Sequence, residues 1–209
     1  MNLPARKMSQ TVALGLGLST LPALRLYSKL PMQQNNRLRT LLATLVLGFA
    51  SCASTASSDA MAVTDFEANT APIYIQEAIT VTQVAGAPNS PSWYESAIIN
   101  PEFKKALSVS LLSLGWLQVP EQARYHLTAN IQEQETNMRG LDAEAWVTTR
   151  YVLIKAKATT PIYDHTIKTG FQVPHGVAFT GVEKMRLALE GAAKQNITEL
   201  LQGLTSLPQ

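Results

Sequence analysis

The chain has 209 residues, of which 46% are apolar and 15% are charged, so it is long enough to bury the core of one ordinary domain. Its single cysteine, Cys52, excludes disulfide bonds within the chain, cysteine-rich zinc sites and CxxC redox chemistry. Residues 1–51 carry six basic residues and no acidic one, whereas residues 52–209 carry 15 acidic and eleven basic residues, a net charge of −4 that disfavours nucleic-acid binding.

The amino-terminal region has the order of a secretory signal. Residues 41–50 (LLATLVLGFA) are apolar, Arg37 and Arg39 precede them, and the small residue Ser51 follows. A membrane-spanning helix needs about 20 apolar residues. The ten-residue apolar stretch therefore predicts a cleaved signal rather than a permanent span.

The four residues Phe49, Ala50, Ser51 and Cys52 resemble the lipobox of bacterial lipoproteins, although Phe49 stands where leucine is usual. The resemblance implies that Cys52 is diacylated, becomes the new amino terminus after cleavage and is acylated again. Two or more acyl chains anchor a protein stably in a membrane. Ala53 after the cysteine implies sorting to the outer membrane, facing the periplasm. The alternative is a small buried cysteine that happens to follow a signal.

A signal that begins at Met32 is already complete, so we interpret residues 1–31 as an upstream extension outside the fold and residues 32–51 as the signal peptide. The small polar composition after Cys52 predicts a flexible tether over residues 52–70. Residues 71–209 then form the periplasmic domain.

Apolar and polar residues alternate from residue 73 to residue 84, which predicts a strand with an irregularity near Glu77. Asn100 is a good helix cap and a proline follows it, so we expect a helix over residues 101–114, where apolar residues recur at helical spacing up to Gly115.

Three further strands are predicted over residues 125–132, 145–157 and 162–172, and their short connections indicate a meander. Thr180 and Glu183 form a capping-box pattern at the start of a long helix, whose apolar stripe is Val182, Met185, Leu189, Ala193, Ile197, Leu200 and Leu204. We expect a Glu190–Lys194 pair on its opposite face. The prediction is an α+β two-layer sandwich of order β-α-β-β-β-α, with a mostly antiparallel four-stranded sheet and two helices.

The chain lacks the common sequence motifs of hydrolases, zinc peptidases, nucleotide-binding proteins and calcium-binding loops. His126, His165 and His175 have no ligand spacing, so we expect no metal, no cofactor and no catalytic residue. Four acidic residues flank a proposed turn at residues 138–140, namely Glu133, Glu135, Asp142 and Glu144. They are either a calcium or carboxylate-pair site or, as we expect, a solvated hairpin tip with Arg139 as counter-charge.

Two loops are candidate partner contacts. Trp93 and Tyr94 lie between serines and prolines, where they either pack onto the sheet edge or meet a partner. The loop over residues 173–179 either covers one end of the sheet or forms a binding lip.

The segment from residue 147 to residue 204 resembles a group of small uncharacterised proteobacterial lipoproteins. The likeness is carried above all by the run from Ala178 and Phe179 through Gly181, Val182 and Glu183 to the helix, with Ser92-Trp93 as a companion feature. The architecture is more distantly similar to periplasmic accessory lipoproteins of lipopolysaccharide export or peptidoglycan-synthase activation. These likenesses imply a fold and bring no catalytic residue.

We therefore expect a non-enzymatic protein, anchored in the outer membrane by lipid on Cys52, that binds an envelope protein, glycan or lipid in envelope assembly or maintenance. One alternative is an envelope hydrolase or transferase that uses the acidic hairpin or the His175 loop. Another is a lipoprotein that carries lipid in a groove between sheet and helices.

Overall fold

The computed structural model describes residues 55–67, 73–89 and 96–208. The signal, Cys52 and the candidate contacts Trp93 and Tyr94 lie outside these ranges. Residues 51–209 cluster as one compact unit.

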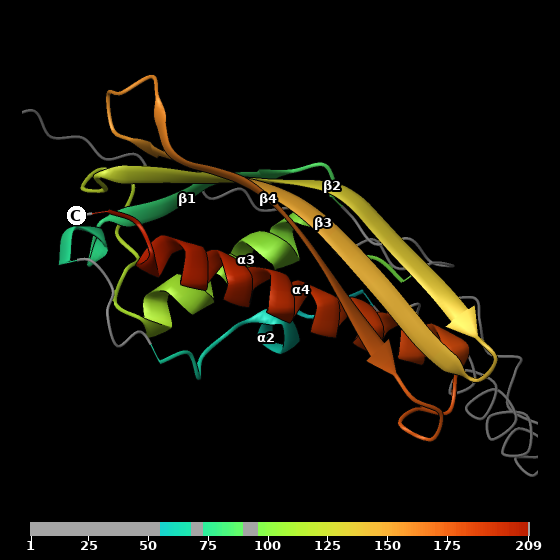
Figure 1. Ribbon diagram of the computed structural model, residues 1–209. Coiled ribbons are helices and arrows are strands. Elements are labelled where there is room, and N and C mark those ends of the chain that lie inside the picture. The colour runs from blue at the N-terminus through green and yellow to red at the C-terminus, as the bar shows by residue number, and fades with distance from the viewer. Residues whose placement is uncertain (1–54, 68–72, 90–95, 209) are drawn as a thin grey trace, which may run out of the picture. The chain divides into compact units, whose positions relative to one another are not determined.

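The sheet has four strands in the order β1-β2-β3-β4. They are β1 (Ile79–Ala85), β2 (Tyr125–Arg139), β3 (Asp142–Lys155) and β4 (Pro161–Val173), as Figure 1 shows. The β1–β2 pairing is parallel, whereas β2–β3 and β3–β4 are antiparallel. The sheet is therefore mixed and mostly antiparallel.

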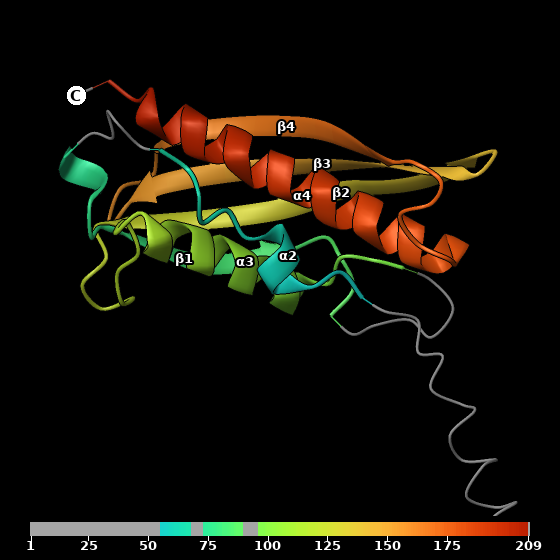
Figure 2. The same ribbon diagram turned by 90° about the horizontal axis from the view of Figure 1, so that it is seen from below.

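The helices lie on one face of this sheet (Figure 2). They are α2 (Ser58–Met61), α3 (Asn100–Ser113) and α4 (Gly181–Thr205), with a 3-10 turn at Ile73–Ile75. None of the helices in the described part of the chain is long and apolar enough to cross a membrane. The predicted α+β sandwich is confirmed, with α2 as an added element.

The predicted Thr180 cap is present in α4, and the predicted apolar stripe is buried from Leu189 onward, whereas its first residue, Val182, is 39% exposed. The Thr180 hydroxyl accepts a hydrogen bond from the Glu183 amide at 3.2 Å. The stripe residues from Leu189 to Leu204 are fully buried against the sheet. This burial supplies most of the driving force for the helix.

Two glycines in α4 allow β4 to pack closely. A Cβ at Gly191 would lie 2.3 Å from the ring of Phe171, and one at Gly203 would lie 2.5 Å from the Tyr163 hydroxyl. Glycine is costly inside a helix. Here it makes room for the aromatic rings of the neighbouring strand.

The strand predicted over residues 73–84 is wrong in its first half, because β1 begins only at Ile79. The three residues before Gln76 form a 3-10 turn, and Glu77 has a positive φ of 45°, which no extended strand adopts. The Glu77 amide instead donates to the Gly115 carbonyl at 2.8 Å, so this segment packs against the end of α3.

A flexible tether was expected over residues 52–70, but residues 55–67, the part of it that the structure describes, pack onto the domain. Ala56, Met61 and Val63 are buried in the hydrophobic core. The Val63 amide donates to the Ser110 hydroxyl of α3 at 2.9 Å, and the Ser58 amide donates to a carboxylate oxygen of Glu102 at 3.1 Å. This segment is part of the domain despite its small polar composition.

Glu190 takes part in the same docking. Its side chain is buried, pairs with Arg186 at 2.7 Å and accepts a hydrogen bond from the Ser57 amide at 2.8 Å. The expected Glu190–Lys194 pair is therefore wrong, since Lys194 pairs with Asp65 at 3.7 Å. The amino-terminal segment therefore contacts the face of α4 that sequence periodicity assigns to solvent, through Ser57 at Glu190 and Asp65 at Lys194.

Candidate binding face

The face of the sheet opposite the helices is not covered by any element that the structure describes (Figure 1). We call it the open face. Alternate residues of the three long strands project from it, and those with polar or aromatic side chains include Asn130, Glu133, Glu135, Asn137, Glu144, Trp146, Thr148, Arg150, Asp164, Thr166, Lys168 and Gln172.

A bulge in β2 determines which acids reach this face. The register of β2 with β3 shifts between Ile131 and Glu133, which leaves Gln132 as an extra residue. After the shift Glu133 and Glu135 lie on the open face, while Gln134 turns inward. Its side chain exchanges two hydrogen bonds with the backbone of Ile98, at 2.8 and 3.1 Å.

Trp146 is the aromatic residue of this face, and its side chain remains 39% exposed. It lies opposite Gly170 in the β3–β4 register. A Cβ at Gly170 would meet three carbons of the indole ring at 2.5 to 2.6 Å, so one face of the ring covers the glycine backbone. The exposed part of the ring and the Lys168 ammonium over it form a surface that we call the platform.

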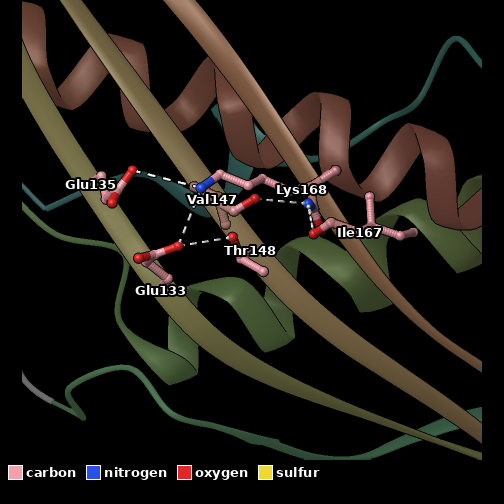
Figure 3. Close-up of polar contacts among 7 residues, drawn as sticks. Glu133, Glu135, Val147, Thr148, Ile167 and Lys168 are labelled. Atoms are coloured by element: carbon pink, nitrogen blue, oxygen red, sulfur yellow. Dashed lines mark hydrogen bonds and ion pairs between the residues drawn. The ribbon is translucent and has the colours of Figure 1, made fainter.

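A charged group flanks the Trp146 ring. Lys168 Nζ lies 3.4 Å from a carboxylate oxygen of Glu133, 3.8 Å from one of Glu135 and 6.0 Å from the centre of the Trp146 ring. Figure 3 shows the lysine between the two acids, with the Thr148 hydroxyl directed at Glu133. The hydrogen bond and charge of Lys168 lower the pKa of the Glu133 carboxyl, which stays ionised near neutral pH.

Replacing Lys168 with methionine is expected to raise the pKa of Glu133 toward its ordinary value, because the main group that stabilises the carboxylate is removed. A lowered pKa stabilises the fold at neutral pH, and this contribution is lost as the pH falls through that pKa. An NMR titration of the Glu133 carboxyl measures the change. Lys194→Met is the control, and an unchanged Glu133 pKa in Lys168→Met would contradict the assignment.

The buried side chain of Asn196 on α4 is hydrogen-bonded to β3 and β4, the two strands beneath the platform. Asn196 Nδ2 donates to the carbonyls of Val147 at 3.2 Å and Ile167 at 3.0 Å, and to the Thr169 hydroxyl at 3.1 Å. Its Oδ1 accepts a hydrogen bond from the Tyr151 hydroxyl at 2.7 Å. Burial raises the pKa of Tyr151, so this hydroxyl remains a donor. Figure 3 shows the contacts at Val147 and Ile167.

The four acids around the β2–β3 turn do not converge on one site. Asp142 accepts a hydrogen bond from the His175 amide at 2.8 Å, and Glu144 pairs with Arg139 at 3.1 Å. No group of three or more potential metal ligands comes together within the ranges that the structure describes.

The three histidines are also separate. His126 lies on β2 opposite Ile154, and the ring of His165 lies 4.5 Å from that of Tyr163 on β4. His175 Nδ1 lies 3.7 Å from a carboxylate oxygen of Asp142, and both side chains are solvent-accessible. The acidic hairpin and the His175 loop thus share one carboxylate–histidine contact at the surface.

Two hollows bear on binding. A shallow groove beside the platform is lined by Glu135, Thr136, Asn137, Arg139, Glu144 and Trp146. A mostly apolar hollow at the far end of the sheet, where α4 ends, is lined by Tyr74, Tyr125, Lys155, Ile162, Leu207 and Pro208. Neither of these hollows lies in the middle of the interface between sheet and helices, which is the place that the lipid-carrier alternative requires.

Sequence reasoning missed Trp146 as a surface residue. Residues 145–157 carry apolar side chains on both faces of the predicted strand, which is typical of a central, buried strand. Regular pairing counted from Ile154 and Pro161 at the turn would place Trp146 opposite Thr169, and only the register shift after Leu153 puts it opposite Gly170.

Comparison with protein-family models and with curated proteins found no match. Among solved structures, the chain is similar to the DUF330 protein from Xanthomonas campestris, with 15% identity, a TM-score of 0.45 and coverage of 63% of this chain and 87% of that one. It is also similar to two lipoproteins. These are the minor lipoprotein from Acinetobacter baumannii (9% identity, TM-score 0.37, 61% and 93% covered) and lipoprotein GNA1162 from Neisseria meningitidis (8% identity, TM-score 0.25, 60% and 98% covered).

The fold is thus distantly similar to those of small bacterial lipoproteins.

Proposed function

We propose that the protein is a lipid-anchored, non-enzymatic lipoprotein of the outer membrane that binds a glycan strand of peptidoglycan through its open face. The anchor rests on the apolar stretch over residues 41–50 and on Cys52 after it. The observation that carries the binding role is the Trp146 platform, whose ring lies against Gly170, stays 39% exposed and has Lys168 Nζ over it.

The chemistry around the platform fits a sugar chain. A flat indole face offers apolar surface to the C–H side of a sugar ring. The groove beside it supplies carboxylate, amide and guanidinium groups from Glu135, Asn137 and Arg139, which can pair with sugar hydroxyls and carboxylates. The groove is open and shallow, as binding to a polymer requires.

The lowered pKa of Glu133 does not suit this carboxyl to the role of a general acid. A general acid for glycosidic cleavage needs a carboxyl with a raised pKa. The pKa of Glu133 is lowered instead, chiefly by its hydrogen bond with Lys168, so it serves as an acceptor of hydrogen bonds. Lys168 in turn is held in place beside the ring.

Replacing Trp146 with alanine is expected to weaken co-sedimentation of the protein with isolated peptidoglycan sacculi, on the order of tenfold in affinity, because an aromatic anchor is lost. The ring is more than a third exposed, so the fold is retained. Phe179→Ala is the matched control, since it removes another exposed aromatic ring that lies outside the open face. Equal sedimentation of Trp146→Ala and the wild-type protein would contradict the proposal, as would the absence of wild-type binding.

A further inference from the structure

Exposed apolar side chains gather at one end of the domain, at the end of β2 and the start of α4. They are Met138 (38% exposed), Leu141 (68%), Val177 (57%), Phe179 (105%) and Val182 (39%). We call them the end patch. Figure 2 shows that the β2–β3 turn and the start of α4 lie at the same end, opposite the carboxyl terminus. A Cβ at Gly181 would lie 4.0 Å from Met138 Cε, so the end of β2 and the start of α4 are neighbours. Exposed apolar side chains gathered in this way are typical of a contact with a membrane or a partner.

The two segments that carry the end patch are held together by polar contacts. Lys184 Nζ of α4 donates to the Leu141 carbonyl at 2.9 Å. The Asp142 carboxylate accepts the His175 amide at 2.8 Å, which joins the start of β3 to the loop before α4. These hydrogen bonds hold the β2–β3 turn against the start of α4, so the apolar residues of the end patch lie on two segments that are joined to each other.

The amino-terminal segment enters the domain beside this patch. The Ala56 amide donates to the Ala97 carbonyl at 3.2 Å, and the hydroxyl of the adjoining Ser96 donates to the Val182 carbonyl at 3.0 Å. Cys52 is four residues before Ala56 in the chain. Even a fully extended chain of that length spans no more than about 14 Å.

We propose that the end patch lies on the bilayer into which the acyl chains of Cys52 insert, with Phe179 at the boundary between headgroups and acyl chains. This inference rests on the acylation in the proposed function and does not depend on the glycan. The short distance along the chain keeps the patch within reach of the lipid surface, and its apolar side chains gain free energy by leaving water there.

The same placement keeps Trp146 away from the lipid, while Arg139 of the groove is next to Met138 of the end patch in the chain. Trp146 is five residues along β3 from Leu141, which corresponds to about 17 Å at the rise of a strand. The platform therefore stands above the headgroups while the turn touches them.

The test uses the full chain produced with its signal in a Gram-negative host, purified in its acylated form and reconstituted into vesicles of phosphatidylethanolamine and phosphatidylglycerol. Phe179→Trp adds a fluorophore to the end patch. Emission is compared between vesicles with ordinary acyl chains and vesicles brominated near the headgroups. We expect bromination to quench Phe179→Trp more than the wild-type protein.

Leu112→Trp is the matched control. Leu112 is 64% exposed in the last turn of α3, near the start of β1 and β2. The end patch is at the other end of β2, about 45 Å away along that strand. We expect Leu112→Trp to show no more quenching than the wild-type protein.

The intact mass of the purified protein distinguishes a failure of the end-patch inference from a failure of the proposed acylation. If the protein carries acyl groups and Phe179→Trp is quenched no more than Leu112→Trp, the end patch does not contact lipid and the inference is overturned. If the protein forms a dimer whose emission at Phe179→Trp is shielded without vesicles, the patch binds a second copy instead. If the mass shows no acyl groups, the anchor itself is wrong, and the inference falls with it.

Discussion

Cys52→Ser is expected to lose all fatty-acyl mass, because a serine hydroxyl does not form the thioether that holds the diacylglyceryl group. Each buried methylene of an acyl chain contributes about 0.8 kcal/mol to membrane binding, and two or more chains hold a protein stably. Without them, a chain whose signal is also removed should pass from the membrane fraction to the soluble fraction. Fractionation with immunoblotting measures the change, and intact mass reports the acyl groups.

Cys52→Ser also removes the cysteine at which the signal is expected to be cleaved, so the signal can stay on the chain. Its apolar stretch over residues 41–50 can then keep the unprocessed chain at the membrane, and this needs a control. Phe49→Ala combined with Cys52→Ser places small residues at the positions that ordinary signal cleavage requires, and this double variant should be released. Phe49→Ala alone keeps Cys52 and should stay in the membrane. A double variant that is cleaved after Ser51 and still sediments with membranes would contradict anchoring by lipid.

Asn196→Leu is expected to lower the free energy of unfolding by about 3 kcal/mol. The substitution leaves the buried hydroxyls of Tyr151 and Thr169 and the carbonyls of Val147 and Ile167 without the amide that joins them. Each buried polar group that loses its partner costs about 1–3 kcal/mol. Urea unfolding followed by circular dichroism measures the change as a lower midpoint.

Two further variants make this test specific. In the Asn196→Leu background, Tyr151→Phe should restore part of the lost stability, because it removes a hydroxyl that has no partner. Gln195→Leu changes an exposed amide on the same turn of α4 and should shift stability by less than about 0.5 kcal/mol. If Asn196→Leu and Gln195→Leu unfold at the same urea concentration, the network does not stabilise the fold.

Much of the fold follows from local sequence signals. The existence of the three long strands and of α4 was predictable because periodicity, turn residues and the cap at Thr180 agree. The predicted end of β2 at residue 132 was too early, since the strand continues past its bulge to Arg139. The structure of residues 73–78 was not predictable in full. Apolar and polar residues alternate there as in a strand, but the backbone forms a turn with a positive φ at Glu77. The docking of residues 55–63 was also hidden, since small residues such as Ala56 carry no periodic apolar signal although they are buried.

The candidate binding face was less predictable, because it depends on register. A regular β2 would place Gln132 and Gln134 on the open face, and only the bulge brings Glu133 and Glu135 there. Glu190 was expected at the surface for a related reason. Its first partner, Arg186, lies one turn earlier on the same helix. Its second partner, Ser57, is far away in the sequence, and only tertiary packing brings the Ser57 amide to Glu190.

The carboxylates of Glu102 and Glu190, which hold the amides of Ser58 and Ser57, also set the effective length of the tether. With this segment docked, only the few residues after Cys52 separate lipid from domain, a span of about 14 Å at most. If residues 55–67 detached, the same chain would become a flexible linker with a mean reach of about 20 Å and no fixed direction. The distance at which the domain works from the bilayer is therefore a property of a folding equilibrium, and a variant can change it without adding or removing a residue.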